Sequence, residues 1–152
     1  KRLVFLGDTG HAEMGERYAG YVEAHNEAGL EHDTALIFPI DLTSQAAYNK
    51  INETILQHGL NFDGIVACSD MVALGALKAL KERYIAIPGE VGIVGFDDIA
   101  MAELLHPALT TIRQNTREAA SVMVTQLLNQ LNGKPAFSEV IDIELIVRKS
   151  AS

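Results

Sequence analysis

Acidic and hydroxyl side chains follow several short apolar runs in this chain of 152 residues. They stand at Asp8, Asp41, Ser69, Asp70, Asp97 and Asp98. Arg17 lies near the start of the first predicted helix, so its side chain points back toward the same region. Carboxylates accept hydrogen bonds from hydroxyl groups, and a guanidinium donates several bonds in a fixed fork. These residue types together suit a small molecule that carries several hydroxyl groups.

Each of these residues also has a purely structural explanation. Asp70 is better explained as a helix N-cap than as a ligand contact, and Asp98 can cap a short helix after it. Asp8 and Asp41 can simply end strands, because Asp is common in turns. Arg17 can pair with an acidic neighbour on its own helix. Position alone leaves the ligand role and the structural role equally open for Asp97, Ser69 and Arg17.

Catalytic and metal-binding readings have weaker support. Asp97 and Asp98 could hold a hard cation together with Asp8, but no lysine ends a strand beside them. The five histidines lack metal-ligand spacing: His11, His25, His32, His58 and His106. Cys68 ends an apolar run and is expected to be a core thiol. Without a G-x-S-x-G, P-loop or G-x-G-x-x-G motif, the sequence predicts no enzyme, no cofactor and no metal site.

Apolar runs alternate with helical patterns along the chain, which positions these polar residues. Strands are predicted at 3–6, 35–38, 64–68, 91–96 and 140–147, with an extended piece at 110–113. Helices are predicted at 16–28, from Thr43 or Ser44 to 57, at 71–83 after a cap at Ser69 or Asp70, at 99–105 and at 117–131. This alternation predicts an α/β fold of three α/β/α layers, Rossmann-like, around a mostly parallel sheet. Ligands bind such sheets beyond the carboxyl ends of their strands.

Composition and net charge narrow the classes of function that this chain can have. Hydrophobic residues make up 48% of the chain, charged residues 21%, and the formal net charge is −8. A chain this acidic binds nucleic acid poorly, since phosphate contacts need a basic face. No apolar run is long enough to span a membrane, and the single cysteine fits a cytoplasmic protein. The chain enters a strand at once without a signal-peptide pattern, so we expect a trimmed product.

Several segments together resemble the effector-binding core of the LacI/GalR family of transcription repressors. They are R-Y-A-G-Y at 17–21, F-D-G-I-V-A-C-S-D-M-V-A-L-G-A at 62–76, I-P-G-E-V-G-I-V-G-F-D-D at 87–98, P-A-L-T-T-I-R-Q at 107–114 and E-L-I-V-R-K-S at 144–150. Each is weak alone, but their order and spacing make a specific pattern that covers nearly the whole chain.

The resemblance implies a periplasmic-binding-protein-like fold of type I, of which this chain is the C-terminal subdomain. That subdomain would comprise about 1–113 and 138–152, and about 114–137 would cross to a missing N-terminal subdomain. The DNA-binding headpiece would also be absent. The implied partners are a sugar-like effector, operator DNA through the headpiece, and a second copy in a homodimer. The apolar stripe between about 115 and 137 is expected to fold back, swap or pack on a neighbour.

The resemblance also implies roles for individual residues. Asp97 would hold ligand hydroxyls, Arg17 would clamp the ligand, and Ser69 would face the pocket. The full effector set is Asp97, Arg17, Ser69, His11, Glu13, Leu42, Gln114 and Thr116. Leu42 stands where many members have an aromatic residue that stacks on the ligand, and this difference weakens the expectation that such stacking occurs here. The implied dimer contacts are Met71, Leu74, Leu77, Lys78 and Met101.

Two other functions stay open at this point. A periplasmic sugar-binding protein of a transporter shares the fold, although the segments at 87–98 and 107–114 favour the repressor. An enzyme is the third reading, because acids at a sheet edge can also serve catalysis.

Overall fold

A computed structural model describes all residues of the chain, 1–152, and centres on one sheet. Its strands are β1 (Leu3–Leu6), β2 (Ile37–Phe38), β3 (Gly64–Ala67), β4 (Gly92–Asp97), β5 (Thr110–Gln114) and β6 (Ile143–Ile146). They lie in the order β2-β1-β3-β4-β5-β6, all parallel except for the antiparallel β6. The predicted mostly parallel α/β fold is therefore confirmed, and the carboxyl ends of β1 to β5 share one edge.

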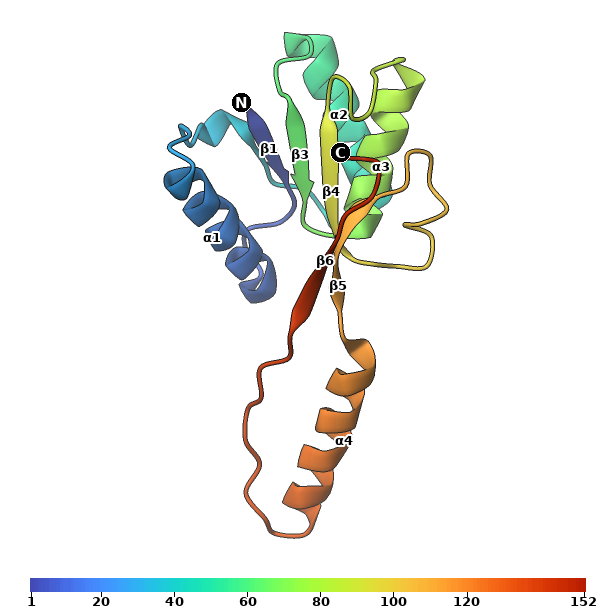
Figure 1. Cartoon of the computed structure of the whole chain (residues 1–152). Coiled ribbons are helices and arrows are strands. Elements are labelled where there is room, and N and C mark those ends of the chain that lie inside the picture. The colour runs from blue at the N-terminus through green and yellow to red at the C-terminus, as the bar shows by residue number, and fades with distance from the viewer.

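Helices cover both faces of this sheet, as Figure 1 shows. On one face lies α1 (Ala12–Glu27), whose Tyr18 and Tyr21 pack on the ring of Phe5 in β1. On the other lie α2 (Ser44–His58) and α3 (Asp70–Glu82). The fully buried residues beneath α3 include Ile65 and Ile93 of the central strands. This packing fixes the polar ends of β3 and β4 rigidly against α3.

The first helix and the edge strands differ from the predicted bounds. α1 begins at Ala12, ahead of the predicted residue 16, because Met14 is buried and anchors an extra turn. The predicted strand at 35–38 opens as a 3₁₀ turn, Thr34–Leu36, since Asp33 caps it by accepting the amide of Ala35. Only two residues of β2 and four of β6 pair with the sheet. Edge strands have a partner on one side only, which limits their length.

The predicted short helix at 99–105 is wrong. This segment forms turns, with hydrogen bonds from Ala102 N to Ile99 O (2.8 Å) and from Leu104 N to Met101 O (3.0 Å). Its first amide, Ile99 N, donates to the carboxylate of Asp70 at 2.9 Å. The carbonyl of Ala102 accepts the amide of Leu109 at 2.8 Å. These turns are closed by hydrogen bonds between residues three apart, whereas an α-helix needs bonds between residues four apart.

The structure also decides between the two candidate caps of α3. Ser69 is the N-cap, and its hydroxyl accepts the amide of Val72 at 3.3 Å. The interpretation of Asp70 as the cap is therefore wrong. Its fully buried carboxylate instead accepts Thr111 Oγ1 at 2.6 Å. Burial raises the pKa of Asp70, although this hydrogen bond and the one from Ile99 oppose the rise.

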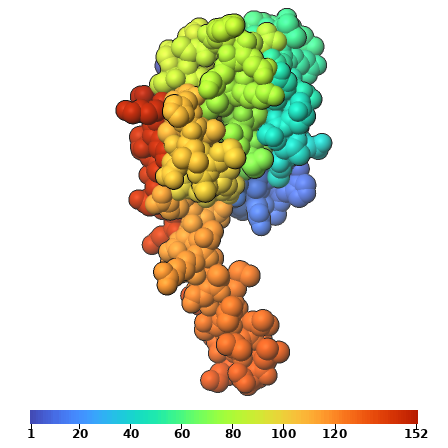
Figure 2. Space-filling model, turned by 90° about the vertical axis from the view of Figure 1, so that its right-hand side faces the viewer, coloured from blue at the N-terminus to red at the C-terminus, as the bar shows by residue number.

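The last helix, α4 (Thr116–Leu131), projects away from the sheet on the ribbon formed by β5 and β6 (Figures 1 and 2). None of its residues is buried. The expectation that its apolar stripe folds back onto the chain is wrong, because the antiparallel pairing of β5 with β6 directs the ribbon away from the core. At least half of each of its side chains Val124, Leu127 and Leu131 is exposed. No helix in the structure combines the length and apolar character needed to cross a membrane.

Candidate ligand-binding site

Asp97 is the last residue of β4 and lies at the carboxyl edge of the sheet. Its backbone has φ of 121°, a left-handed conformation that non-glycine residues rarely adopt. One carboxylate oxygen, Oδ1, accepts the side-chain amide of Gln114 at 2.8 Å. Burial raises the pKa of Asp97, and the nearby positive charge of Arg17 partly opposes that rise. The carboxylate is thus half-buried and bound to a neutral partner.

Arg17 reaches the same edge from the first turns of α1. Its guanidinium carbon lies 3.7 Å from the ring centroid of Phe96, the residue before Asp97. Its Nη1 donates to the main-chain carbonyl of Cys68, at the end of β3. Arg17 forms no ion pair, so the alternative of a surface pair with an acid on its own helix is wrong. The cation–π contact and the carbonyl hold the charge beside Asp97 while leaving donors free.

The remaining predicted effector residues lie less close together. Gln114 is bonded to Asp97, and the hydroxyl of Ser69 is used by the helix cap. The ring of the largely exposed His11 contacts the carboxylate of Asp8. The others are exposed and make no side-chain hydrogen bond: Glu13, Leu42 and Thr116. Within this chain the structure therefore brings together Asp97, Arg17 and Gln114.

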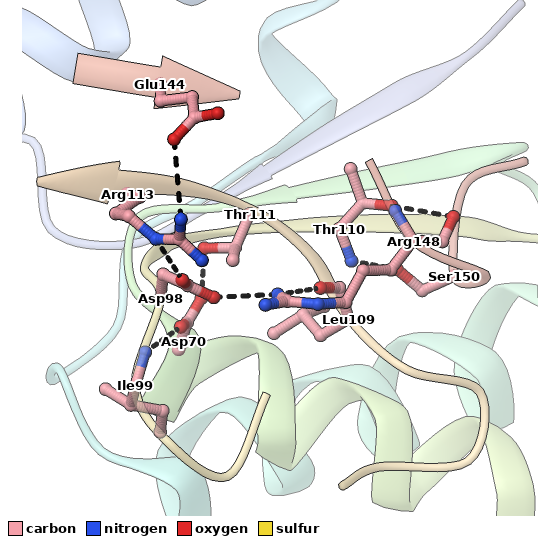
Figure 3. A network of polar contacts seen from close by, with 10 residues as sticks. All are labelled: Asp70, Asp98, Ile99, Leu109, Thr110, Thr111, Arg113, Glu144, Arg148 and Ser150. Carbon is pink, nitrogen blue, oxygen red and sulfur yellow. Dashed lines mark hydrogen bonds and ion pairs between the residues drawn. The ribbon is translucent and has the colours of Figure 1, made fainter. Parts of the chain in front are cut away.

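Asp98 turns away from this edge. Its carboxylate accepts Arg113 Nε at 2.7 Å, and Arg148 Nη1 lies 2.7 Å from its other oxygen (Figure 3). Burial acts to raise the pKa of Asp98, but its contacts with Arg148 and Arg113 outweigh burial, so the pKa is lowered. Asp98 caps no helix, and it does not face Asp8, which accepts the amide of Gly10 at 2.7 Å. No group of three acidic, His or Cys side chains gathers to hold a metal ion.

Phe96 and Arg148 are parts of this region that the sequence reasoning missed. Phe96 looked like an ordinary core residue at the end of an apolar run, and Arg148 came directly after the predicted closing strand. Period-two alternation along 92–97 would have put Phe96 on the same face as Val94, the α1 face. No local signal connected Arg148 to Asp98, which is 50 residues away.

The predicted dimer residues share one groove on the side of the sheet that α2 and α3 cover. The groove has a volume of about 580 Å³ and lies between α2, α3 and the turns at 101–105. Its lining includes Met71, Leu74, Leu77, Lys78 and Met101. Met71 and Met101 are about half exposed, whereas Leu77 is buried and contributes only to the floor. The groove is thus lined by apolar side chains together with the charged groups of Lys78, Lys81 and Glu82.

Comparisons with known proteins agree with this fold. A family model of the periplasmic binding protein-like domain matches residues 1–151. The HTH-type transcriptional regulator RegA of Clostridium saccharobutylicum is 36% identical over 157 residues, which cover 99% of this chain and 46% of RegA. The crystal structure of a LacI-family sugar-binding transcriptional regulator from Escherichia coli has 34% identity and a TM-score of 0.86, with 98% of this chain and 54% of that chain covered.

A further solved structure is a complex of the transcriptional regulator CelR with cellobiose. It has 28% identity and a TM-score of 0.91, with 99% of this chain and 46% of that chain covered. The chain belongs to the periplasmic binding protein-like domain family, in the form found in LacI-family regulators. The family expected from the sequence segments is therefore confirmed. The chain spans about half the length of the relatives it matches.

Proposed function

We propose that this chain is the effector-sensing part of a LacI-type transcription repressor, and that Asp97 and Arg17 bind a sugar or a related hydroxylated molecule. The observation that carries the proposal is the proximity of these two side chains at one sheet edge. A half-buried carboxylate with only a neutral partner lies beside a guanidinium that is held by an aromatic ring. Such a pair offers an acceptor and several donors to adjacent hydroxyl groups, in charge-assisted bonds.

The proposal includes the wider effector set and the division of the chain. His11, Glu13, Leu42, Ser69 and Thr116 lie at or near the same edge and would complete the site when a second subdomain closes over it. In this proposal, residues 1–113 and 138–152 form one subdomain, and 114–137 cross to the other. The β5–β6 ribbon and the exposed stripe of α4 support this division, because an unpartnered apolar helix needs a surface to cover it.

Effector binding would then control DNA through a headpiece outside this chain. A ligand gripped between two subdomains favours one angle between them, and that preference is a coupling free energy with the DNA site. The relatives are transcription regulators, which supports this reading over a transporter's binding protein. We likewise propose that the protein catalyses no reaction and acts in the cytoplasm.

A ligand screen on the full-length protein tests the proposal. Thermal unfolding would be followed with cellobiose, galactose, ribose and glucose 6-phosphate, each at millimolar concentration. A ligand present at a hundred times its Kd stabilises the folded state by roughly 2.7 kcal/mol, which raises Tm by several degrees. We expect such a rise with at least one of these compounds, followed by a change in operator affinity. If none of them alters either Tm or DNA binding, the sugar-sensor proposal fails.

We also propose that the groove of Met71, Leu74, Leu77, Lys78 and Met101 contacts a second copy in a homodimer. Met71→Glu would bring a carboxylate into that contact, and an unpaired buried charge is costly. We expect the dimer dissociation constant to rise at least about tenfold, which corresponds to roughly 1.4 kcal/mol. Sedimentation velocity at several concentrations measures it. Leu56→Glu, on an exposed position of α2 outside the groove, is the matched control. Equal dimerisation of both variants would contradict the assignment.

A further inference from the structure

Two adjacent residues at the proposed site have unusual backbone conformations. Asp97 has φ of 121° and Asp98 has φ of 53°. Residues other than glycine rarely occupy this half of conformational space, and they stay there only when their surroundings hold them. The surroundings of these two residues therefore determine where the Asp97 carboxylate points.

The side chain of Asp98 supplies one of these restraints (Figure 3). It is only 8% exposed and contacts two arginines. Arg113 Nε donates to its Oδ2 at 2.7 Å from β5, and Arg148 Nη1 lies 2.7 Å from its Oδ1. Arg148 also donates to the carbonyl of Leu109 at 2.9 Å. The carboxylate of Asp98 thus links the end of β4 to Arg113 in β5 and to Arg148, which lies just beyond β6.

Asp70 restrains Ile99, the residue that follows Asp98. Its Oδ2 accepts the amide of Ile99 at 2.9 Å, and its Oδ1 accepts Thr111 Oγ1 at 2.6 Å. Both carboxylates therefore link the segment 97–99 to β5 (Figure 3). Gly95 leaves room for Asp70, since a Cβ at that position would lie 2.3 Å from its Oδ1. The bend is fixed from the core side as well as from the ribbon.

The side-chain contacts between β4 and β5 cross the strand register, in which Asp97 lies opposite Arg113. Asp98 binds Arg113, and Asp97 binds Gln114, the next residue of β5. A ligand hydroxyl at Asp97 would compete with the amide of Gln114, which lies at the root of the crossing segment. The contact of Asp98 with Arg113 would persist, because the low exposure of Asp98 keeps it away from the ligand. Asp97 would thus face the ligand, whereas Asp98 would hold the backbone around it in place.

We propose that Asp98 is a positioning residue for effector binding: paired with Arg113 and Arg148, it holds Asp97 in its ligand-facing conformation and fixes the root of the β5–β6 ribbon. This inference rests on the proposed sugar-sensing function. Asp98 itself does not touch the effector. Its loss lowers affinity by freeing the bend at 97–99, and local mobility there rises whether or not a ligand is present.

Asp98→Asn in the full-length protein tests this role by two measurements. The substitution keeps the shape of the side chain and removes its charge. In hydrogen exchange without ligand, amides in 97–99 and 111–114 should exchange at least tenfold faster, while those of α2 and α3 stay at the wild-type rate. A role in global stability alone would accelerate exchange throughout the domain. In calorimetry, the Kd for the panel sugar that raises Tm most should increase at least tenfold.

Two further sets of variants sharpen the test. Glu144→Gln removes only the exposed contact of Arg113 at 3.4 Å and should leave both readouts unchanged. Arg113→Gln should reproduce Asp98→Asn, and Arg113→Lys should restore most of the affinity, because it keeps the positive charge. If Asp98→Asn does not fold, the two Arg113 variants decide alone.

The outcomes separate this inference from the proposed function. Wild-type exchange rates and wild-type affinity in Asp98→Asn would overturn the positioning role, as would an equal loss in Glu144→Gln. If no panel sugar binds the wild-type protein, the sensing proposal fails. The exchange rates then decide whether Asp98 holds the bend: a local increase supports that role, and unchanged rates refute it.

Discussion

Replacing Asp97 with asparagine in the full-length protein is expected to weaken sugar binding by roughly 10- to 100-fold. Hydrogen bonds to a charged group contribute about 1.5–3 kcal/mol, and about 1.4 kcal/mol corresponds to tenfold in affinity. Asparagine tolerates the positive φ of this position better than alanine does, so the loss reports on the charge. Isothermal titration calorimetry with the best ligand of the panel measures the change. Arg17→Ala should cause a loss of similar size.

The control for this result is Glu53→Ala, an exposed acid on α2 whose partners, Lys50 and Gln57, lie on the same helix. It should bind the ligand as the wild-type protein does. Unchanged affinity in both Asp97→Asn and Arg17→Ala would refute the proposed site. A loss in Glu53→Ala as well would indicate a general effect on the fold.

The pH dependence of affinity gives an independent check on the same carboxylate. Burial raises the pKa of Asp97 above its ordinary value of 3.8. Ligand hydroxyls donate to the ionised form, so affinity should fall as the pH drops through the raised pKa. The same shift acts on stability with the opposite sign, because the folded state holds the proton more tightly and loses that advantage as the pH rises above 3.8. Asp97→Asn should remove this part of the pH dependence of binding.

The second large effect is expected at Gly75, where α3 crosses α2. A Cβ on this residue would lie 2.0 Å from the main-chain oxygen of Ser44 and 2.8 Å from Cβ of Ala47. Main-chain atoms of a packed helix cannot move aside without separating the two helices. We therefore expect Gly75→Ala to destabilise the fold by roughly 3 kcal/mol, the upper end of the usual cost of overpacking. The lowering of Tm in thermal unfolding measures this effect.

Gly20 offers a matched control for that substitution. It lies within α1, it is exposed, and a Cβ there would meet no atom within 4 Å. Gly20→Ala should raise stability by about 0.5–1 kcal/mol, since alanine loses less entropy in a helix. Opposite signs for the two glycines are the expected result. Equal Tm values for both variants would show that the contact between α2 and α3 is looser than described.

The elements that the sequence predicted well are those with strong local patterns. The continuous apolar runs of β1, β3 and β4 need both faces buried, and this requirement led directly to a parallel sheet covered on two sides. Gly59, with φ of 69°, ends α2 where the sequence indicated a stop. Thr43 caps that helix by accepting the amide of Ala46. Each of these features depends on residues a few positions apart.

The errors concern carboxylates whose partners lie far along the chain. A local pattern predicts that Asp70 caps its own helix. In the fold, its carboxylate instead accepts hydrogen bonds from Thr111 and Ile99, which lie far along the chain. Asp98 is similar, because its partner Arg148 approaches from beyond β6. Only the assembled sheet brings such groups together.

The candidate site was predictable in part, for the same reason. Asp97 was placed at the carboxyl edge because it follows a strand, and Arg17 because it lies near a helix start. The structure finds them beside Phe96 and Gln114. The structural use of Ser69 and the contact of His11 with Asp8 depend on exact side-chain directions. Sequence spacing does not determine those directions.

The most direct test of the ligand grip by Asp97 and Arg17 is a crystal structure of the full-length protein with the panel sugar that stabilises it most. We expect one sugar hydroxyl within hydrogen-bond distance of the Asp97 carboxylate and another near the Arg17 guanidinium, with the amide of Gln114 shifted from Asp97. A sugar bound elsewhere, with the bond between Asp97 and Gln114 intact, would contradict the assignment of this edge as the effector site.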